Sequence, residues 1–344
     1  MNIENKVLGL IKLSAYIKEF LAKNPEDYND HDTEFELLLK RSEIENPWFT
    51  LENQKFALTE WTHLLTQDNI NNWLRNYSVS KSSKRVGLIL AGNIPLVGLH
   101  DVISVVLSGH IPLIKLSSKD KQMVPFLLKK WNDLSDGAIQ FEFVERLENF
   151  DAVIATGSNN TARYLEYYFK DHLNIIRKNR TSVAVLKGDE TPEELQLLAE
   201  DIFRYFGLGC RNVTRIFIPE HFIIDRLFES FIGFQDIINH NKYANNYDYN
   251  RAVYLLNQDK FWDNNFVMLK EDDKLFSPLS VIHFSRYSSL DNVKNFIAEN
   301  EENIQCIVAK EELGLDSIPF GEAQHPALDT YADNVDTMKF LEVV

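Results

Sequence analysis

The sequence has few cysteines and no long hydrophobic run. Only Cys210 and Cys306 occur among its 344 residues. They are far apart and show no framework spacing, so free thiols in a reducing compartment are expected, and we predict the cytoplasm. No apolar run approaches the ~18 residues of a transmembrane helix. The N-terminus lacks a signal-type apolar region. Stable membrane insertion is therefore not expected.

Basic residues are also scarce relative to acidic ones, with 36 Lys and Arg against 51 Asp and Glu and a formal net charge of −15. Nonspecific nucleic-acid binding needs a basic footprint, so nucleic acid is not an expected partner. None of the nine histidines forms a His-Glu-x-x-His motif or a His/Cys cluster. We therefore predict no metal site. The chain length suggests two domains.

The first part of the chain, 1–80, has a helical pattern. Apolar residues fall on one face of an expected helix over Val7–Ala22. An acidic loop over Glu26–Glu34 follows, and Thr50 is a candidate N-cap for the next helix. The interpretation is a helical segment that precedes the main fold.

From Arg85 onward, short apolar runs alternate with helical segments. This alternation predicts βαβ units with a parallel sheet, in which nucleotides bind at the loops that follow the strands. The expected strands are 86–90, 111–116, 139–144, 151–155, 181–186, 213–218, 253–256 and 279–284, with a short closing strand after a loop-like tail. Thr191-Pro192 is a good start signal for the helix that runs to Phe206.

Cys210 follows that helix directly after Gly207 and Gly209, just before a strand. Glycine tolerates positive φ and lets the backbone approach a ligand. A thiol on such a turn can reach a substrate carbonyl while backbone N–H groups face the developing oxyanion. For a lone cysteine the alternative is a buried structural thiol.

Three stretches after strands carry further candidates. In Gly92-Asn93-Ile94-Pro95, the Asn93 carboxamide could complete an oxyanion hole, or serve ordinary turn chemistry. Lys115 and Ser117 end another strand, where the lysine could bind ribose hydroxyls or a phosphate, or simply extend toward solvent. Thr156-Gly157-Ser158 opens a helix whose N-terminus could attract phosphate, although such turns are common.

Together these stretches are more specific, because Asn93, Lys115, Gly157-Ser158 and Gly209-Cys210 occur in an order and spacing that resembles the aldehyde dehydrogenase superfamily. Within it, Phe206-Gly-Leu-Gly-Cys-Arg-Asn-Val213 and Phe320-Gly-Glu-Ala-Gln-His-Pro326 look like the LuxC-type acyl-CoA reductases. The resemblance covers roughly 45–344. It implies an α/β protein with two Rossmann-like α/β domains and an N-terminal helical segment.

The resemblance implies a mechanism. Cys210 would attack the thioester of a fatty acyl donor, and Asn93 with the Cys210 backbone N–H would hold the oxyanion. Hydride from NADPH, with NADH as the alternative, would release a fatty aldehyde. The cofactor would lie against Lys115, Ser117 and the Thr156–Ser158 turn. The donor is acyl-CoA or an acyl-carrier or acyltransferase thioester, and family members often self-associate, so a homo-oligomer is expected.

Two departures from the superfamily stand out. The water-activating Glu of its Glu-Leu-Gly-Gly motif has no carboxylate counterpart in 177–181, which favours thioester reduction over aldehyde oxidation. Its Glu-Ile-Phe-Gly-Pro motif becomes Lys274-Leu-Phe-Ser-Pro278, so the ribose carboxylate is replaced by Lys274. What would lower the pKa of Cys210 is open, with Arg211 and local dipoles as candidates.

The expected organisation is a helical segment at 1–80, a nicotinamide-cofactor domain at 81–180, a catalytic domain with the cysteine at 181–315 and a C-terminal return segment at 316–344. Two rival functions remain: reversible CoA-acylating oxidation of a short aldehyde, and acyl-CoA binding without catalysis in a fatty-acid reductase complex. Cys306 in its apolar run is expected in the core, and a structural turn role is favoured for His325.

Overall fold

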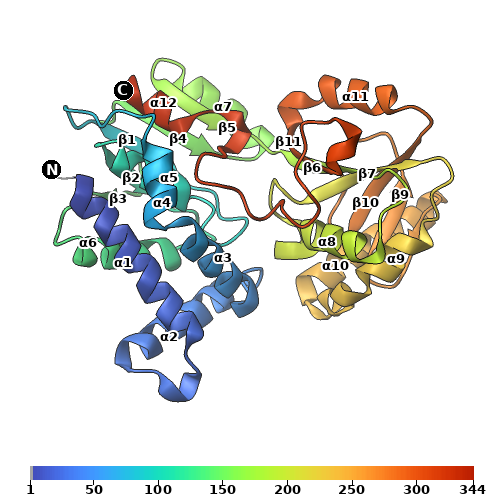
Figure 1. Ribbon diagram of the computed structural model, residues 1–344, viewed down its shortest axis with the longest axis horizontal. Coiled ribbons are helices and arrows are strands. Elements are labelled where there is room, and N and C mark those ends of the chain that lie inside the picture. Colours follow the sequence, from blue (N-terminus) through green and yellow to red (C-terminus); the bar gives the residue numbers. More distant parts are fainter. Residues whose placement is uncertain (1–2) are drawn as a thin grey trace. The chain divides into compact units, whose positions relative to one another are not determined.

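A computed structural model describes residues 3–344. The chain forms two compact units: unit 1 holds the residues up to Lys178 together with Ala327–Val344, and unit 2 holds Asn179–Pro326. The return segment expected at 316–344 is therefore divided between the units at Pro326. Each unit contains one sheet, as the α/β prediction requires (Figure 1).

Unit 1 begins with helices and continues as an α/β sheet. The helices are α1 (Ile3–Ala22), α2 (Asp30–Glu45), α3 (Leu51–Leu64), α4 (Gln67–Leu74), α5 (Leu99–Leu107), α6 (Met123–Leu134), α7 (Asn159–Phe169) and α12 (Thr337–Glu342). The strands are β1 (Arg85–Ile89), β2 (Ile111–Lys115), β3 (Glu142–Phe143), β4 (Ala152–Thr156) and β5 (Leu173–Arg177). All neighbours pair in parallel in the order β3-β2-β1-β4-β5, so the loops after β1, β2 and β4 meet at one edge.

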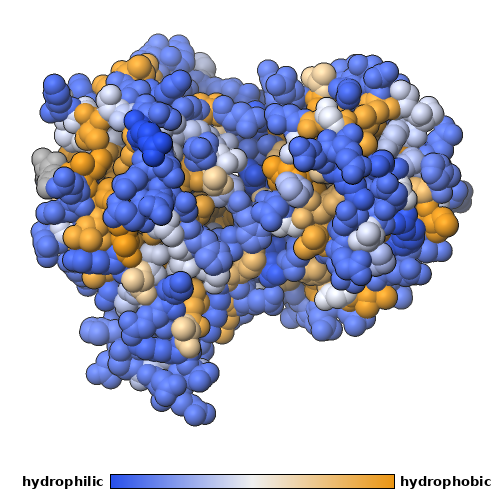
Figure 2. All heavy atoms as spheres, viewed as in Figure 1, coloured by the Kyte–Doolittle hydropathy of each residue, from blue (hydrophilic) through white to orange (hydrophobic). Residues whose placement is uncertain are grey.

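The helical segment of unit 1 follows from its capping residues and its apolar face. Thr50 accepts the N–H of Asn53 at 3.3 Å, which confirms it as the N-cap of α3. The acidic loop is shorter than expected, because Asn29 and Asp32 form a capping box that starts α2 at Asp30. In Figure 1 the α1–α2 connection is the lower end of unit 1, and Figure 2 shows hydrophilic residues covering it.

Unit 2 is also an α/β unit, with one sheet and four α-helices among the described residues. Its helices are α8 (Pro192–Phe203), α9 (Asp225–Phe231), α10 (Asn241–Asn257) and α11 (Leu290–Glu299), and its strands are β6 (Thr181–Val185), β7 (Val213–Pro219), β8 (Trp262–Asp263), β9 (Met268–Glu271), β10 (Val281–Tyr287) and β11 (Ile304–Ala309). The strand order is β11-β6-β7-β10-β9-β8, parallel except for the β8–β9 pair. The core packs α8 and α9 against β7 through buried aliphatic and aromatic side chains.

Two predicted strands are wrong. Residues 253–256 lie in α10, where Tyr243, Tyr247 and Tyr254 are buried at helical spacing. A four-residue apolar run cannot separate a strand from one turn of a helix, and the tyrosine pattern around it decides for the helix. The closing strand at the end of the chain is instead α12, whose N-cap Asp336 accepts the N–H of Lys339.

Candidate active site

Cys210 lies at the centre of a β-turn between α8 and β7. The N–H of Asn212 donates to the carbonyl of Gly209 at 3.1 Å, so Cys210 and Arg211 are the two central residues of the turn. Both cysteines are free thiols, and Cys210 is half-buried. The thiol is therefore presented on a short, hydrogen-bonded turn directly before a strand.

The chain reaches this turn through three successive residues with left-handed backbone. Tyr205, Phe206 and Gly207 have φ values of 54°, 60° and 75°. Two of them are aromatic residues with a Cβ, a conformation that costs of order 1 kcal/mol or more for each. A Cβ on Gly207 would lie 3.3 Å from the carbonyl oxygen of Ile202. Gly207 thus meets the expectation of positive φ, while Gly209 is not among the positive-φ glycines of the described chain.

The buried carboxamide of Asn212 holds the turn against the end of α8. Its Oδ1 accepts the N–H of Gly209 at 2.7 Å. Its Nδ2 donates to the carbonyls of Asp201, Ile202 and Arg204 at 3.1, 3.3 and 2.9 Å. Carbonyls at a helix C-terminus have no partner within the helix. One side chain therefore satisfies them and fixes the backbone around Cys210.

Ser182 on β6 connects the two cysteines. Its Oγ donates to the carbonyl of Cys210 at 3.1 Å and lies 3.0 Å from Sγ of Cys306. Burial raises the pKa of the Cys306 thiol. Cys306 packs against the core of unit 2, so it is the structural thiol of the pair.

The Phe320–Pro326 segment is attached to the same region. Asp201 on α8 is fully buried, and its two oxygens accept the N–H groups of Gly321 and Ala323 at 2.7 and 2.9 Å. Burial raises the pKa of Asp201 to about 6, against the opposing effect of these two N–H groups. Arg211 Nε donates to the Ala323 carbonyl at 2.6 Å. The segment therefore lies beside the cysteine turn.

His325 ends a turn in this segment, where its N–H donates to the carbonyl of Glu322 at 3.1 Å, and its side chain is exposed. Arg211, the candidate for activating Cys210, directs its Nε to Ala323.

The other predicted site residues gather at the carboxyl edge of the sheet in unit 1. Lys115 is the exposed last residue of β2, and Thr156 is the last residue of β4. Ser158 caps α7 by accepting the N–H of Thr161 at 3.2 Å, and the Gly157 N–H donates to the Arg177 carbonyl at 3.1 Å.

Asn93 lies in the loop after β1, the strand between β2 and β4. Ser117 lies in the loop after β2, two residues beyond Lys115. The structure thus brings all six unit 1 candidates, Asn93, Lys115, Ser117, Thr156, Gly157 and Ser158, to one sheet edge. Cys210 belongs to unit 2.

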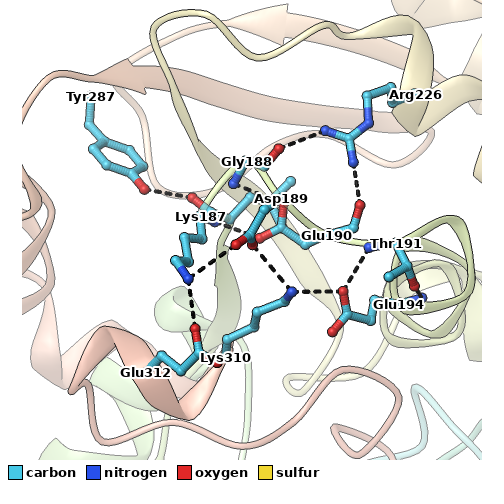
Figure 3. A network of polar contacts seen from close by, with 11 residues as sticks. Lys187, Gly188, Asp189, Glu190, Thr191, Glu194, Arg226, Tyr287, Lys310 and Glu312 are labelled. Atoms are coloured by element: carbon cyan, nitrogen blue, oxygen red, sulfur yellow. Dashed lines mark hydrogen bonds and ion pairs between the residues drawn. The ribbon is translucent and has the colours of Figure 1, made fainter.

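Ion pairs within unit 2 occupy the carboxyl ends of β6 and β11 (Figure 3). Lys187 pairs with Asp189 and Glu312 at 3.1 and 2.7 Å, and Lys310 pairs with Asp189 and Glu194 at 3.2 and 2.9 Å. An anionic ligand would have to displace these carboxylates.

Two further side chains hold the loop that follows β6. Buried Glu190 accepts the N–H groups of Lys187 and Gly188, and Arg226 donates to the carbonyls of Gly188 and Glu190 (Figure 3). In unit 2 the turn before β7, which carries Cys210, is therefore the better candidate for a reactive site.

The two positions that depart from the superfamily pattern have defined partners. Arg177 is buried and pairs with Asp101 at 2.5 Å, and it also donates to Thr337 at 3.0 Å. The Lys274 backbone N–H donates to Asp272 at 3.0 Å, and its carbonyl accepts from buried Arg215 at 2.8 Å. The region 177–181, which lacks the water-activating carboxylate of the superfamily, therefore begins with a buried, ion-paired arginine.

Sequence reasoning missed Asn212, Asp201 and Ser182 as parts of the site. Asn212 lies within the Phe206–Val213 motif, but the motif alone assigns it no role. The sequence could have indicated a buried partner for Asp201, because this residue falls on the apolar face of α8 with Leu198 and Ile202. An unpaired carboxylate avoids such a position. Ser182 sits in an apolar strand and carries no comparable signal.

No metal-binding group was found in the described chain: no three or more His, Cys, Asp and Glu side chains of residues 3–344 are arranged to hold an ion. Likewise, none of the helices that the structure describes is long and apolar enough to cross a membrane.

The fold is that of aldehyde dehydrogenases. Aldehyde dehydrogenase 21 from Physcomitrella patens, solved with the product succinate, is 14% identical and aligns over 100% of this chain and 84% of its own, with a TM-score of 0.65. An NAD+ complex of aldehyde dehydrogenase from Bacillus cereus is 13% identical over 90% and 72%, with a TM-score of 0.62. The Mycobacterium tuberculosis enzyme complexed with NAD+ is 12% identical over 90% and 76%, with a TM-score of 0.59.

A family comparison of the sequence identifies a narrower group than the aldehyde dehydrogenase fold. The family model of the acyl-CoA reductases (LuxC) matches residues 50–225, just over half of the chain, and this range includes Asn93 and Cys210. The chain belongs to the LuxC acyl-CoA reductase family, and it is an oxidoreductase of the acyl-CoA and aldehyde type. No curated protein sequence matches it significantly.

Proposed function

We propose that the protein reduces a fatty acyl thioester to an aldehyde through an acyl-enzyme on Cys210. The observation that carries the proposal is the placement of the Cys210 thiol at the centre of a β-turn that Asn212 holds on the end of α8. A nucleophile must be held in place while the carbonyl carbon approaches it. The match of the acyl-CoA reductase family across this turn supports the same chemistry.

In the first step the Cys210 thiolate attacks the acyl carbonyl carbon, and the electron pair of the C=O bond moves to oxygen. The Asn93 carboxamide and the Cys210 backbone N–H are the proposed donors to this oxyanion. The C=O bond then re-forms and the bond to the donor thiol breaks. Cys210 now carries the acyl group as a new thioester, and the donor leaves as a thiolate.

The proposed cofactor is NADPH, with NADH as the alternative. The residues at the carboxyl edge of the unit 1 sheet suit it chemically. Lys115 offers an exposed ammonium group, Ser117 and Ser158 offer hydroxyls, and α7 presents its N-terminus. These are donors for phosphate and ribose oxygens. When bound, the nicotinamide supplies the hydride that releases the acyl group as an aldehyde.

The Arg177–Asp101 ion pair favours reduction over hydrolysis. Asp101 is the carboxylate partner of Arg177 and is buried with it. Because Asp101 is buried and one of its oxygens accepts from the Arg177 guanidinium, it is poorly placed to take a proton from water. Water is then not activated against the Cys210 thioester. The proposed acyl donor is acyl-CoA or a carrier- or acyltransferase-bound thioester, and the proposed compartment is the cytoplasm.

The experiment is intact-protein mass spectrometry after incubation with acyl-CoAs of graded chain length, without cofactor. The wild type should gain the mass of one acyl group. Cys210→Ala should gain none, and Cys306→Ala, the matched control, should behave as the wild type. Adding NADPH should remove the adduct and release the aldehyde.

Each rival gives a different result. A preference for short acyl groups, with faster CoA-dependent aldehyde oxidation than thioester reduction, would favour the reversible CoA-acylating enzyme. Acyl-CoA affinity without any adduct, together with no aldehyde from a carrier-protein thioester, would contradict catalysis and favour the binding role.

A further inference from the structure

The loop that carries Asn93 touches the loop after β2 on both sides of that residue. On one side, a Cβ on buried Gly92 would lie only 2.5 Å from Oγ of Ser117. On the other side, the N–H of Leu96 donates to Oδ2 of Asp120 at 3.3 Å. Leu96 has a φ of 60°, so the chain turns sharply there. Asn93 thus lies on a short segment with an anchor at each end.

Asp120 makes the second anchor from a buried position. Its side chain is 4% exposed and lies just before α6. Its carboxylate accepts the N–H groups of Leu96 and Met123, the first residue of α6, and burial raises its pKa to about 6 in spite of them. Among the described residues, Oδ1 of Asp120 has no hydrogen-bond partner. The carboxylate therefore joins the Asn93 loop, the β2–α6 loop and the start of α6.

Stability alone does not account for a carboxylate at this place. A buried charge is costly, and so is a buried polar oxygen without a partner. Ser or Thr would cap the start of α6 without either cost. Both have shorter side chains than aspartate, whose Oδ2 also accepts the Leu96 N–H in this arrangement. An aspartate at position 120 therefore suits a role in joining the two loops better than a role in capping α6.

We propose that Asp120 is a positioning residue for the reaction: it holds the Gly92–Leu96 loop, and with it Asn93, against the β2–α6 loop, which carries Ser117 and begins directly after Lys115. The inference rests on the proposed function in one respect, that Asn93 acts on the acyl oxygen. Loops at the end of a strand are mobile unless they are anchored, and an oxyanion donor is effective only when its position is set before the reaction. Asp120 therefore acts through Asn93 and not on the substrate.

The first test is hydrogen exchange in the full-length protein without ligands. Asp120→Ala removes the acceptor of the Leu96 N–H, and exchange in the peptide that covers residues 92–98 should become about tenfold faster. Asp120→Asn keeps an oxygen acceptor and should restore most of the protection. Asp133→Ala, which changes an exposed carboxylate on α6, is the control. Unchanged exchange in the 92–98 peptide of Asp120→Ala would overturn the proposal.

The second test is a double-mutant cycle on the rate of the acyl-adduct step. Asp120→Ala and Asn93→Ala should each slow the step, and the double variant should be no slower than Asn93→Ala alone, because residues that act together are not additive. Asp120→Asn should recover the rate. Rate losses that multiply in the double variant would contradict a role through Asn93.

The two tests separate the inference from the function on which it rests. A wild-type protein that forms no adduct and releases no aldehyde from any donor overturns the proposed function. Hydrogen exchange at 92–98 still decides in that case whether Asp120 holds the loop, since it needs neither substrate nor cofactor.

Discussion

Asn212 accepts the backbone N–H of Gly209, three positions earlier in the chain, with its side-chain oxygen at 2.7 Å, and Cys210 and Arg211 lie between the two residues. The same carboxamide donates to three carbonyls at the end of α8. The cysteine turn is therefore held by a neutral side chain that uses both its donor and its acceptor. An aspartate side chain has the same shape as asparagine but lacks the N–H donor. Replacing Asn212 with aspartate therefore tests the hydrogen bonds without changing the shape of the side chain.

Asn212→Ala should lower the free energy of unfolding by about 2–3 kcal/mol, because it leaves buried helix-end carbonyls without their partner. Asn212→Asp should lower it at least as much, since a carboxylate would face those carbonyl oxygens. Both variants should also slow acyl transfer to Cys210. Urea titration and the adduct assay measure the two effects. Asn245→Ala, an exposed asparagine on α10, is the control, and equal stability of Asn212→Ala and this control would refute the interpretation.

Asp201 should make the stability depend on pH. Burial raises its pKa from 3.8 to about 6, so the folded protein holds a proton that the unfolded chain has lost between these values. The free energy of unfolding of the wild type, relative to Asp201→Asn, should therefore be largest below about pH 4 and fall as the pH rises through 6. The fall should be on the order of 3 kcal/mol.

Urea titrations of both proteins at several pH values measure this difference. Asp248→Asn, an exposed carboxylate on α10, should follow the wild type. A difference between wild type and Asp201→Asn that rises with pH would mean that the two N–H groups outweigh burial.

The two thiols should differ in reactivity. The thiolate is the reactive form, and burial raises the pKa of Cys306, which also contacts Ser182. Iodoacetamide at neutral pH should therefore label Cys210 well before Cys306. Peptide mass spectrometry measures the extent of labelling at each cysteine over time. In urea both should react alike. Faster labelling of Cys306 in the folded protein would reverse the assignment of the structural and the reactive thiol.

Much of the fold follows from local patterns. The alternation of apolar runs and helices predicts β1, β2, β4, β6 and β7, and Thr50 and Thr191-Pro192 mark the starts of α3 and α8. Because the carboxyl ends of neighbouring parallel strands share one edge, the sequence also places the cofactor-site candidates of unit 1 together. The cysteine turn is predictable for the same reason, as glycines between a helix and a strand indicate a turn.

The partners across long sequence distances are not predictable in this way. Asp201 binds the N–H groups of residues 120 and 122 positions away, and no local propensity encodes that pairing. The strand predicted at 253–256 fails for a related reason, since the burial of Tyr243 and Tyr247 by the rest of unit 2 determines the helix. Asp120 looks like an ordinary acid in a polar loop until its contact with Leu96 is known.

Lys115 should set the preference between the two nicotinamide cofactors. If its exposed ammonium lies near the 2′-phosphate, Lys115→Ala should weaken NADPH binding about tenfold and NADH binding much less, since a charge-assisted contact is worth roughly 1.5 kcal/mol. Cofactor fluorescence titration gives both dissociation constants. Lys129→Ala, an exposed lysine on α6, is the control. Equal losses for the two cofactors would mean that Lys115 contacts a group they share.

Tyr331 should stabilise unit 1 through a chain of buried hydrogen bonds. Trp73 Nε1 donates to the Tyr331 hydroxyl at 2.8 Å, Tyr331 donates to Tyr77 at 2.9 Å, and Tyr77 donates to Asp336 at 3.0 Å. This chain ties the return segment to the N-terminal helices of the unit. Tyr331→Phe keeps the ring but leaves the buried Trp73 N–H without its acceptor, which should cost about 1–3 kcal/mol.

The free energy of unfolding from urea titration measures this loss. Tyr164→Phe removes the hydroxyl of a tyrosine that is 70% exposed on α7, and it should leave stability within about 0.5 kcal/mol of the wild type. Because bonds in such a chain strengthen one another, Tyr77→Phe combined with Tyr331→Phe should cost less than the two separate losses added together. Strictly additive losses would mean that the two hydroxyls act independently, and then each contact, not the chain, holds the return segment in place.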